Sequence, residues 1–544
     1  MKQTNFNRRN FLKTTGVLTL GSLLMPIEAS SARSKKPNIL CITCEDINPY
    51  LHCFGDKIAK TPNLDKLATE GVKFTNVYSC AGVCAPSRFA LITGMYPSSA
   101  GANNMRTNRK DLPNGIPPYE AVPPPEVKCI SEYMRANGYY CTNNVKTDYQ
   151  FKAPVTAWDE CSTSAHWKHR PKGMPFFSIF NLMATHESQV WDRANDPVTI
   201  RPEDVDVPPY YPDTYKIRRD IARVYSNIAI MDREVDELLS QLENDGLMEE
   251  TIIIFYSDHG GPLPRGKREL YDTGLKAPMI IRFPRKRRMG TEVEDLISFV
   301  DIPATILSLA GIEPPGYMHG RAFLGDYIEK PRDYIFAARD RMDGQYDVRR
   351  AVRDKRFKYI RNYKPEIGCY LDIKFRKNLG SMQDLLKMRD QGLLNEDQMY
   401  WFRDHKAPEE LYDLSIDPYE LNNIADNPAY QNELKRLREV HQNWLKRVGD
   451  DPLRSEKELV WSMWPNGKQP VTLQPTYEID NKHLRLVSGT PGASIAFRIN
   501  GKGYKENHWF LYHKPVKIRK GDMIAAQAFR IGYKPSKINT FKYE

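Results

Sequence analysis

The chain has 544 residues, of which 41% are hydrophobic and 27% charged, so it can bury a large core and form two or more domains. Its formal net charge of +11 is scattered through all segments and no nucleic-acid recognition motif accompanies it, which argues against a DNA or RNA partner. The densest basic cluster, at 285–288, is typical of a solvated loop, and the positive surplus suits an anionic substrate.

Residues 1–32 have the composition of an export signal. Paired Arg8 and Arg9 precede a short apolar run at 17–25, and small residues follow at 29–32. This order predicts a leader of twin-arginine type, the export machinery as a partner, and a periplasmic or extracellular location in a bacterium. The apolar run is too short to span a bilayer, so we expect no stable membrane span. A retained membrane anchor is the less favoured alternative.

Strands and helices alternate along the next part of the chain. Apolar runs predict strands over 37–43, 139–145, 176–182 and 251–256, and helical spacing predicts helices over 63–71, 127–137 and 215–244. The alternation indicates an α/β domain with a large, mainly parallel sheet flanked by helices. Ligand sites in such sheets form beyond the carboxyl ends of the strands.

Polar residues follow each of these predicted strands. They are Glu45 and Asp46, then Lys146, then His186, and finally Asp258 and His259. Acids from two separate strand ends are oxygen ligands that suit a hard divalent cation. A lone histidine is more often structural, but its place at a strand end favours a functional role for His186.

The stretch Cys84-Ala-Pro-Ser-Arg88, followed by Ile92-Thr-Gly94, predicts a short helix. Pro86 suits its first turn, and Gly94 suits the residue just past its end. Cys84 then lies at the helix mouth, where unpaired N–H groups favour negative charge, and Arg88 lies on the same face. This arrangement suits attack on an anionic group. A buried cysteine beside a surface arginine is an equally good interpretation of these residues alone.

The other eight cysteines could form disulfides in an oxidising compartment, with a connectivity that the sequence does not define. Cys41-x-x-Cys44, together with Cys80 and Cys84, could also indicate zinc. The first pair lies in a strand-like run without nearby histidines, which disfavours a zinc site.

Beyond residue 330 the character of the sequence changes. Short charged strands over 334–363, a turn-rich connector at 409–418 and a helix over 429–448 predict a smaller α+β C-terminal subdomain. After residue 457 the alternating, aromatic and Gly/Pro-punctuated sequence has no helical period and predicts a small β-sandwich. The sandwich could bind carbohydrate or cap the catalytic domain, and the lack of an aromatic platform favours capping. The predicted domains are 33–330, 331–456 and 457–544.

The motif at Cys84–Gly94 resembles the signature of the type I sulfatases of the alkaline phosphatase superfamily. The resemblance covers approximately residues 37–450, and the segment 257–271 is most similar to the heparan N-sulfatase-like branch. It implies an alkaline phosphatase-like fold and hydrolysis of sulfate esters, or of N-sulfate, in a sulfated glycan. It also implies that a formylglycine-generating maturation enzyme converts Cys84 into formylglycine, whose hydrated aldehyde attacks sulfur.

The resemblance further implies roles for the residues at the strand ends. Ca²⁺, with Mg²⁺ as the alternative, would be held by the residue at position 84 and by Glu45, Asp46, Asp258 and His259. Lys146 and Lys267 would bind the sulfate, Arg88 would help to ionise the hydrate, and His186 would contact the sulfate and protonate the leaving group. Glu45 and His259 replace the family's aspartate and asparagine, and the nitrogen of His259 leaves the identity of the metal open.

Asp148 is a third departure, because the family commonly has Lys-x-His where this chain has Lys146-Thr147-Asp148. Asp148 either takes the base role or contacts the substrate. Two other functions stay open at this point. One is a phosphate or phosphonate monoester hydrolase on the same scaffold, and the other is a non-catalytic glycan-binding protein in which Cys84 stays unconverted.

Overall fold

A nine-stranded sheet organises the computed structural model, which describes residues 36–504 and 508–544. The predicted export signal at 1–32 lies outside these residues. The strand order is β4-β3-β5-β1-β6-β7-β2-β8, with β9 paired to β2. Every pairing is parallel except those of β7 with β6 and β2, which confirms a mainly parallel sheet. The bounds are β1 Asn38–Cys44, β2 Val72–Tyr78, β3 Tyr140–Asn144, β4 Glu160–Cys161, β5 Phe176–Leu182, β6 Thr251–Ser257, β7 Lys276–Arg282, β8 Thr291–Val293 and β9 Ile297–Ser298.

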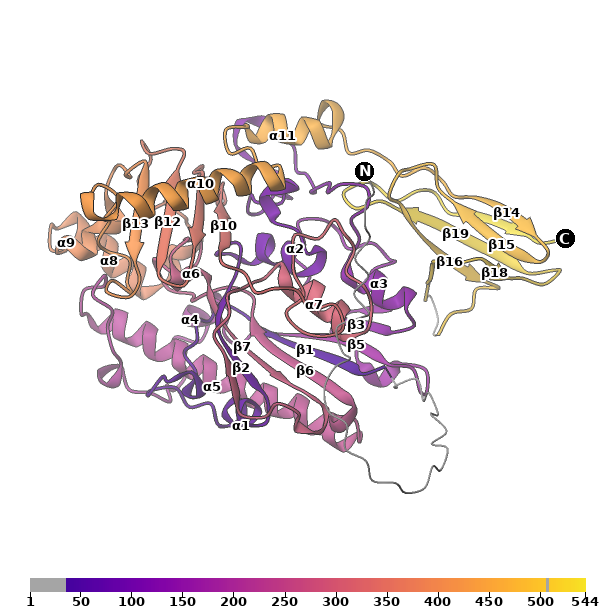
Figure 1. Cartoon of the computed structure of the whole chain (residues 1–544), viewed down its shortest axis with the longest axis horizontal. Coiled ribbons are helices and arrows are strands. Elements are labelled where there is room, and N and C mark those ends of the chain that lie inside the picture. The colour runs from indigo at the N-terminus through magenta and orange to yellow at the C-terminus, as the bar shows by residue number, and fades with distance from the viewer. Residues whose placement is uncertain (1–35, 505–507) are drawn as a thin grey trace, which may run out of the picture. The chain divides into compact units, whose positions relative to one another are not determined.

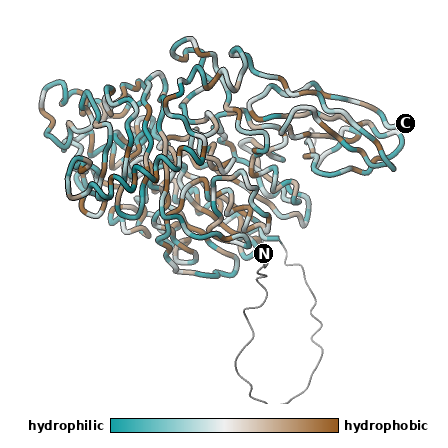
Figure 2. The backbone as a smooth tube through the Cα atoms, turned by 45° about the horizontal axis from the view of Figure 1, so that its top comes forward, coloured by the Kyte–Doolittle hydropathy of each residue, from teal (hydrophilic) through white to brown (hydrophobic). Residues whose placement is uncertain are grey.

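Helices cover both faces of this sheet (Figure 1). On one face, α2 (Cys84–Thr93), α3 (Ile130–Ala136) and α7 (Asp301–Leu309) share a core with Ile39 and Cys41 of β1. On the other, α1 (Pro62–Glu70) and α5 (Tyr215–Asn244) share a core with Leu40 and Ile42, and α8 (Gly380–Asp390) packs against α5. Burial on both faces explains why the strands are continuous apolar runs. In Figure 2 the hydrophobic stretches accordingly gather inside the body, under hydrophilic loops.

Around the large sheet, local signals set the element boundaries to within one residue, except at the start of one helix. The strand at 176–182 and the helix at 215–244 have the predicted ends. The helix predicted from residue 127 begins at Ile130, because Cys129 is its extended N-cap and Glu132 completes a capping box with it. Gly94 ends α2 with a φ of 75°, a left-handed conformation that favours glycine.

The C-terminal subdomain is built on a four-stranded antiparallel sheet of β10 (Ile335–Arg339), β11 (Arg349–Arg353), β12 (Phe357–Asn362) and β13 (Glu409–Asp413). Helix α10 (Gln431–Val448) packs against it. The prediction of a turn-rich connector at 409–418 is wrong for its first half, which forms β13. The charges that resemble a turn sequence are paired, since Glu409 binds Arg438 and Glu410 binds Arg349.

The last part of the chain contains a helix that was not predicted, α11 (Glu456–Met463), which starts with a capping box of Ser455 and Glu458. Beyond it, strands β14 to β20, between Thr476 and Lys542, form a three-stranded and a four-stranded sheet with a separate hydrophobic cluster. Residues 36–544 cluster as one compact unit, so the domain boundaries at 330/331 and 456/457 stay predictions.

The cysteines form no cross-links. All nine lie in the described residues and all are free thiols there, in contrast to the suggested disulfides. Cys41 and Cys44 pack in the hydrophobic cores on opposite faces of the sheet, so they cannot share a zinc ion. Among the described helices, none has both the length and the apolar character that a membrane span requires.

Candidate active site

The polar residues predicted from the strand ends lie at one edge of the sheet. Cys44, the last residue of β1, is in register with Leu182 of β5 and Ser257 of β6. The segments that follow these three strands therefore leave the sheet side by side, and they carry Glu45 and Asp46, His186, and Asp258 and His259. Strand β3 pairs with β5 and brings Lys146 to the same edge.

Helix α2 presents Cys84 at this edge. Cys84 is its first residue, and Ser87 Oγ ties the helix to the end of β6 by donating to the carbonyl oxygen of Asp258 at 2.5 Å. Gly82, two residues before the helix, lets the chain pass close to the backbone of Glu269, because a Cβ at position 82 would lie 2.3 Å from the carbonyl oxygen of Glu269. Arg88 is buried, which excludes the interpretation as a surface arginine, and it bonds to Glu45, Asp258 and Asn181.

Four buried side chains converge around the helix mouth. Ligand atoms of Asp46, Cys84, Asp258 and His259 all lie within 4.8 Å of one another, and Glu45 forms a second such group with Cys84 and His186. His259 Nε2 is 3.0 Å from Asp46 Oδ1 and 3.4 Å from Cys84 Sγ. The three carboxylates fit a hard divalent cation, while His259 adds a nitrogen donor that Ca²⁺ and Mg²⁺ seldom use.

Each buried acid of this cluster has a cationic partner, as buried charges require. Lys146 Nζ is 2.5 Å from Glu45 Oε2, Lys267 Nζ is 2.5 Å from Asp46 Oδ2, and Arg88 Nε is 3.1 Å from Asp258 Oδ2. Burial alone would raise the pKa of Asp46, but Lys267 and His259 outweigh it and hold that pKa well below its ordinary value. The pKa of Asp258 falls to about 2, since His259 and Arg88 outweigh its burial. Both acids are therefore ionised at neutral pH.

The Cys84 thiol and the His186 imidazole are neutral in this environment. Burial raises the pKa of Cys84, against the lowering effect of Lys146 and Lys267, so an unmodified Cys84 is a weak nucleophile. Burial, followed by the charge of Lys267, lowers the pKa of His186. His186 is half-buried, whereas Asp148 is exposed and its Oδ2 lies 3.4 Å from Lys146 Nζ.

Sequence reasoning missed three residues that support this cluster. Glu187 is fully buried, accepts two 2.8 Å bonds from Arg268, and donates its backbone N–H to Asp46 Oδ2 at 2.7 Å. Asn181 accepts a 2.6 Å bond from Arg88. Glu187 directly follows His186 and Arg268 directly follows Lys267, so adjacency to the predicted residues was the available signal.

Comparison with known proteins agrees with this architecture. A family model described as Sulfatase matches residues 37–158 and 162–312, and one described as N-sulphoglucosamine sulphohydrolase, C-terminal, matches residues 265–394. An ulvan-active sulfatase of Formosa agariphila is 49% identical over 541 residues, which covers 92% of this chain and 91% of that protein. The N-sulphoglucosamine sulphohydrolase of Homo sapiens is 25% identical over 492 residues, which covers 81% and 95% of the two chains.

Solved structures share the fold at low identity. One, in complex with its substrate D-glucosamine-2-N,6-O-disulfate, has a TM-score of 0.57 and 18% identity, and the match covers 77% of this chain and 99% of that one. The phosphonate monoester hydrolase of Agrobacterium radiobacter has a TM-score of 0.54 and 19% identity, with 84% and 100% covered. On the strength of the family model and the 49% identical relative, the chain belongs to the type I sulfatases of the alkaline phosphatase superfamily, and it is a sulfuric ester hydrolase.

Proposed function

We propose that the chain is an exported, calcium-dependent sulfatase that hydrolyses sulfate esters, or N-sulfate, of a sulfated glycan through a formylglycine made from Cys84. The observation that carries this proposal is the convergence of Cys84 with Asp46, Asp258 and His259 within 4.8 Å. The substrate class is supported by the relatives, which include ulvan-active and N-sulphoglucosamine enzymes. Export rests on the composition of residues 1–32.

Two groups would act in this cluster, a divalent cation and formylglycine. Glu45, Asp46, Asp258 and His259, together with residue 84, would hold Ca²⁺, or Mg²⁺ as the alternative, and the cation would neutralise charge on the sulfate oxygens. Formylglycine would supply a hydrate in which one hydroxyl is the nucleophile and the other provides an intramolecular route to release sulfate. A plain thiol lacks that route, and its raised pKa at this position also makes it a poor nucleophile.

The cations of the chain would bind the sulfate and stabilise its growing charge. A lysine about 4 Å from a sulfate oxygen contributes roughly 4 kcal/mol at an effective dielectric constant of about 20, before its desolvation cost. Lys146 and Lys267 are assigned to the sulfate, and Arg88 to the ionised form of the nucleophile. His186 is assigned to protonation of the leaving oxygen or nitrogen, since it is half-buried next to this cluster. Because its pKa is lowered, the protonated form that can act as this acid becomes more populated as the pH falls.

Asp148 has two candidate roles that one variant separates. As the base that deprotonates the second hydroxyl, it would be needed for every substrate, whereas as a substrate contact it would matter only for the glycan. Asp148→Asn should lower the turnover of a small aryl sulfate by about 10² or more in the first case. In the second case aryl sulfate turnover stays unchanged and only the kcat/KM for a sulfated oligosaccharide falls.

Two measurements test the proposal as a whole. Mass spectrometry of the peptide that contains residue 84 should detect an aldehyde in place of the thiol, and an intact thiol would instead favour a non-catalytic glycan-binding protein. Turnover of matched aryl sulfate, phosphate and phosphonate esters, followed by a panel of defined sulfated oligosaccharides, should favour the sulfates. Preference for the phosphorus esters would support the alternative, to which the fold shared with a phosphonate monoester hydrolase points. Cys84→Ala is the inactive control.

A further inference from the structure

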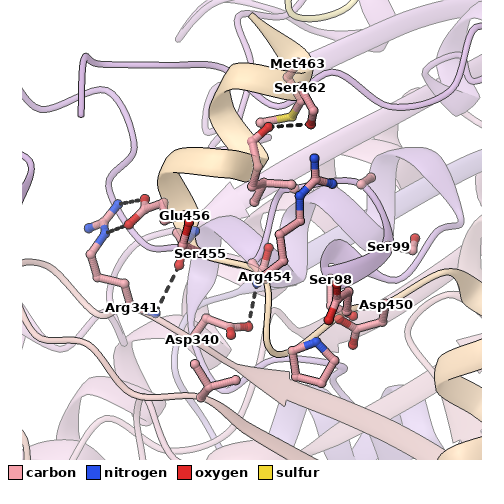
Figure 3. Close-up of a pocket in the computed structure, with 18 of the residues that line it drawn as sticks. Ser98, Ser99, Asp340, Arg341, Asp450, Arg454, Ser455, Glu456, Ser462 and Met463 are labelled. Carbon is pink, nitrogen blue, oxygen red and sulfur yellow. Dashed lines mark hydrogen bonds and ion pairs between the residues drawn. The ribbon is translucent and has the colours of Figure 1, made fainter. Parts of the chain in front are cut away.

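A cavity, here called the α11 pocket, lies beside helix α11 and has a volume of about 770 Å³ (Figure 3). Its lining comes from four parts of the chain: the segment after α2, the C-terminal subdomain, α11 and the β-sandwich. None of the residues assigned to the proposed catalytic site lines it. The volume is within the range of about 300–1,000 Å³ that is typical of ligand pockets.

Buried polar atoms of this lining lack hydrogen-bond partners. Arg530 is only 5% exposed and its Nη2 donates to the carbonyl oxygen of Pro123, while its Nη1 has no partner among the described residues. Ser98 Oγ and Asn103 Oδ1, which also line the pocket, are buried and unpartnered within the same residues. Leaving such groups unbonded is unfavourable, so the lining favours a ligand that offers both donors and acceptors.

The acids in the pocket are largely neutralised by internal partners. Arg350 binds Asp340 at 2.9 Å and Asp450 at 2.6 Å, and Arg341 binds Glu456 at 2.7 Å. Figure 3 shows Arg341 facing Glu456 at the side of the pocket, with Asp340 and Asp450 nearer its centre. These carboxylates are therefore poor candidates for binding a cation.

The cations of the lining are in excess once these pairs are set aside. In the part of the chain that the structure describes, four cationic side chains line the pocket without forming an ion pair: Lys364, Arg454, Lys457 and Arg530. Of the acids that line the pocket in the same residues, only Asp451 lacks an ion pair. Arg454 and Lys457 are exposed, so they can reach a ligand without rearrangement of the core. The unpaired charge of the pocket is positive.

We propose that the α11 pocket binds an anionic oligosaccharide, as a second glycan site apart from the catalytic cluster. The unpaired cations would contact sulfate or carboxylate groups, and the unpartnered Ser98 Oγ and Asn103 Oδ1 would bond to sugar hydroxyls. The proposal rests on the proposed function only in the kind of glycan, because binding at this pocket requires no turnover. The α11 pocket would hold one part of a glycan polymer while another part is hydrolysed at the catalytic cluster.

A charge-reversal pair tests this site. Arg454→Glu with Lys457→Glu, introduced into the inactive Cys84→Ala protein so that the ligand is not hydrolysed, should weaken the binding of a sulfated tetrasaccharide at least about tenfold by titration calorimetry, because two favourable charge contacts become repulsive. The same charge reversal in the enzyme that retains Cys84 should leave the turnover of a small aryl sulfate unchanged. The control is Lys435→Glu with Lys446→Glu, which makes an equal charge change at exposed positions of α10 outside the pocket and should leave the affinity unchanged.

The ligands in the titration identify the chemistry that is recognised. The sulfated tetrasaccharide is compared with a desulfated, uronate-bearing form and with a neutral tetrasaccharide. Weaker binding of the uronate form assigns the site to sulfate, equal binding assigns it to either anion, and both support the proposal. It is overturned by equal binding of the neutral sugar, by unchanged affinity in the pocket variant, or by an equal loss in the control variant. Absence of sulfatase turnover would contradict the proposed function alone, since the binding measurement does not depend on it.

Discussion

Lys267 is the residue on which the charge balance of the proposed catalytic site depends most directly. Its Nζ contacts Asp46 at 2.5 Å and Glu187 at 3.5 Å, and it is almost completely buried. Among the positive charges that lower the pKa of Asp46, the charge of Lys267 has the largest effect. The same charge also helps to lower the pKa of His186. One ammonium group thus favours the ionised form of an acid and, together with burial, the neutral form of a neighbouring histidine.

Replacing this lysine should therefore impair catalysis strongly. Lys267→Met keeps the aliphatic chain but removes the charge, and we expect kcat/KM for an aryl sulfate to fall about 10²- to 10³-fold, the loss typical for a buried group that stabilises transition-state charge. Lys286→Met, at an exposed ion pair with Glu70, is the matched control and should retain full activity. A Lys267→Met enzyme within twofold of the original rate would remove this residue from the mechanism.

Helix α2 is the element that carries the nucleophile position, and its end is fixed by Gly94. The glycine is in the left-handed region, and its carbonyl oxygen accepts backbone N–H groups of His319 and Gly320. A Cβ at this position would lie 2.8 Å from Met318 Cγ. The C-terminal end of α2 is thus held by close contact as well as by backbone conformation.

Gly94→Ala should cost more stability than the backbone conformation alone explains. An alanine in the left-handed region costs about 1–2 kcal/mol, and overpacking against Met318 adds about 1–3 kcal/mol. Gly138→Ala is the control, since Gly138 has a similar φ of 81° but no atom within 4 Å of its Cβ position. Urea unfolding should show the larger loss for Gly94→Ala, and equal losses would mean that the contact with Met318 relaxes freely.

How well an element can be predicted depends on where its stabilising partners lie. The strand at 176–182 and the helix at 215–244 follow from apolar runs and helical spacing within the element itself. Strand β13 does not, because its charged residues are neutralised by arginines far away in the sequence, as Glu410 is by Arg349. Helix α11 has a local start signal in its capping box of Ser455 and Glu458, but its Glu456 is buried against the distant Arg341. A local pattern cannot reveal that such charges will be buried.

The same distinction applies to the site. Cys84, Asp46 and Asp258 could be proposed from a motif and from strand ends, since a parallel sheet brings its carboxyl ends together. Asn181 and Glu187 acquire their significance through contacts with Arg88 and with Asp46, which become visible only after the register of β1, β5 and β6 is known. The sequence could suggest the reacting groups, and the structure was needed to find the groups that hold them.

At the scale of the whole molecule, two largely buried histidines lie in different parts of the fold, His319 in the main domain and His441 in helix α10 of the C-terminal subdomain. His319 Nδ1 accepts the backbone N–H of Tyr96 at 3.1 Å, and the ring of His441 packs on Tyr359 and Trp444. Burial, followed by nearby arginines, lowers the pKa of each histidine to about 4. The folded protein therefore resists protonation at both positions.

This resistance makes the protein sensitive to acid. Unfolded histidine has a pKa near 6.5, so below this pH the unfolded chain binds protons that the folded chain does not. The free energy of unfolding should fall between about pH 6.5 and pH 4, by on the order of 3 kcal/mol for each histidine. Urea unfolding at pH 7.5 and pH 5 should show a smaller loss for His319→Gln with His441→Gln than for the original protein. His483→Gln, at an exposed position of the β-sandwich, should behave like the original protein, and an unchanged loss in the double variant would contradict this account.

The buried acids at the sheet edge should couple the stability of the molecule to a divalent cation. Glu45, Asp46 and Asp258 are fully buried and belong to the segments that follow β1 and β6, so a cation bound by them would hold those strand ends together only in the folded state. A ligand that binds only the folded state stabilises it by about 2.7 kcal/mol when its concentration is 100 times its Kd.

The unfolding midpoint should therefore rise with Ca²⁺ and fall when a chelator is added. Asp258→Asn should abolish most of this shift, whereas Asp236→Asn, on the exposed face of α5, should leave it intact. Because the stability readout needs no turnover and no formylglycine, a midpoint that ignores both Ca²⁺ and chelator would count against the metal assignment itself, whatever the activity of the enzyme.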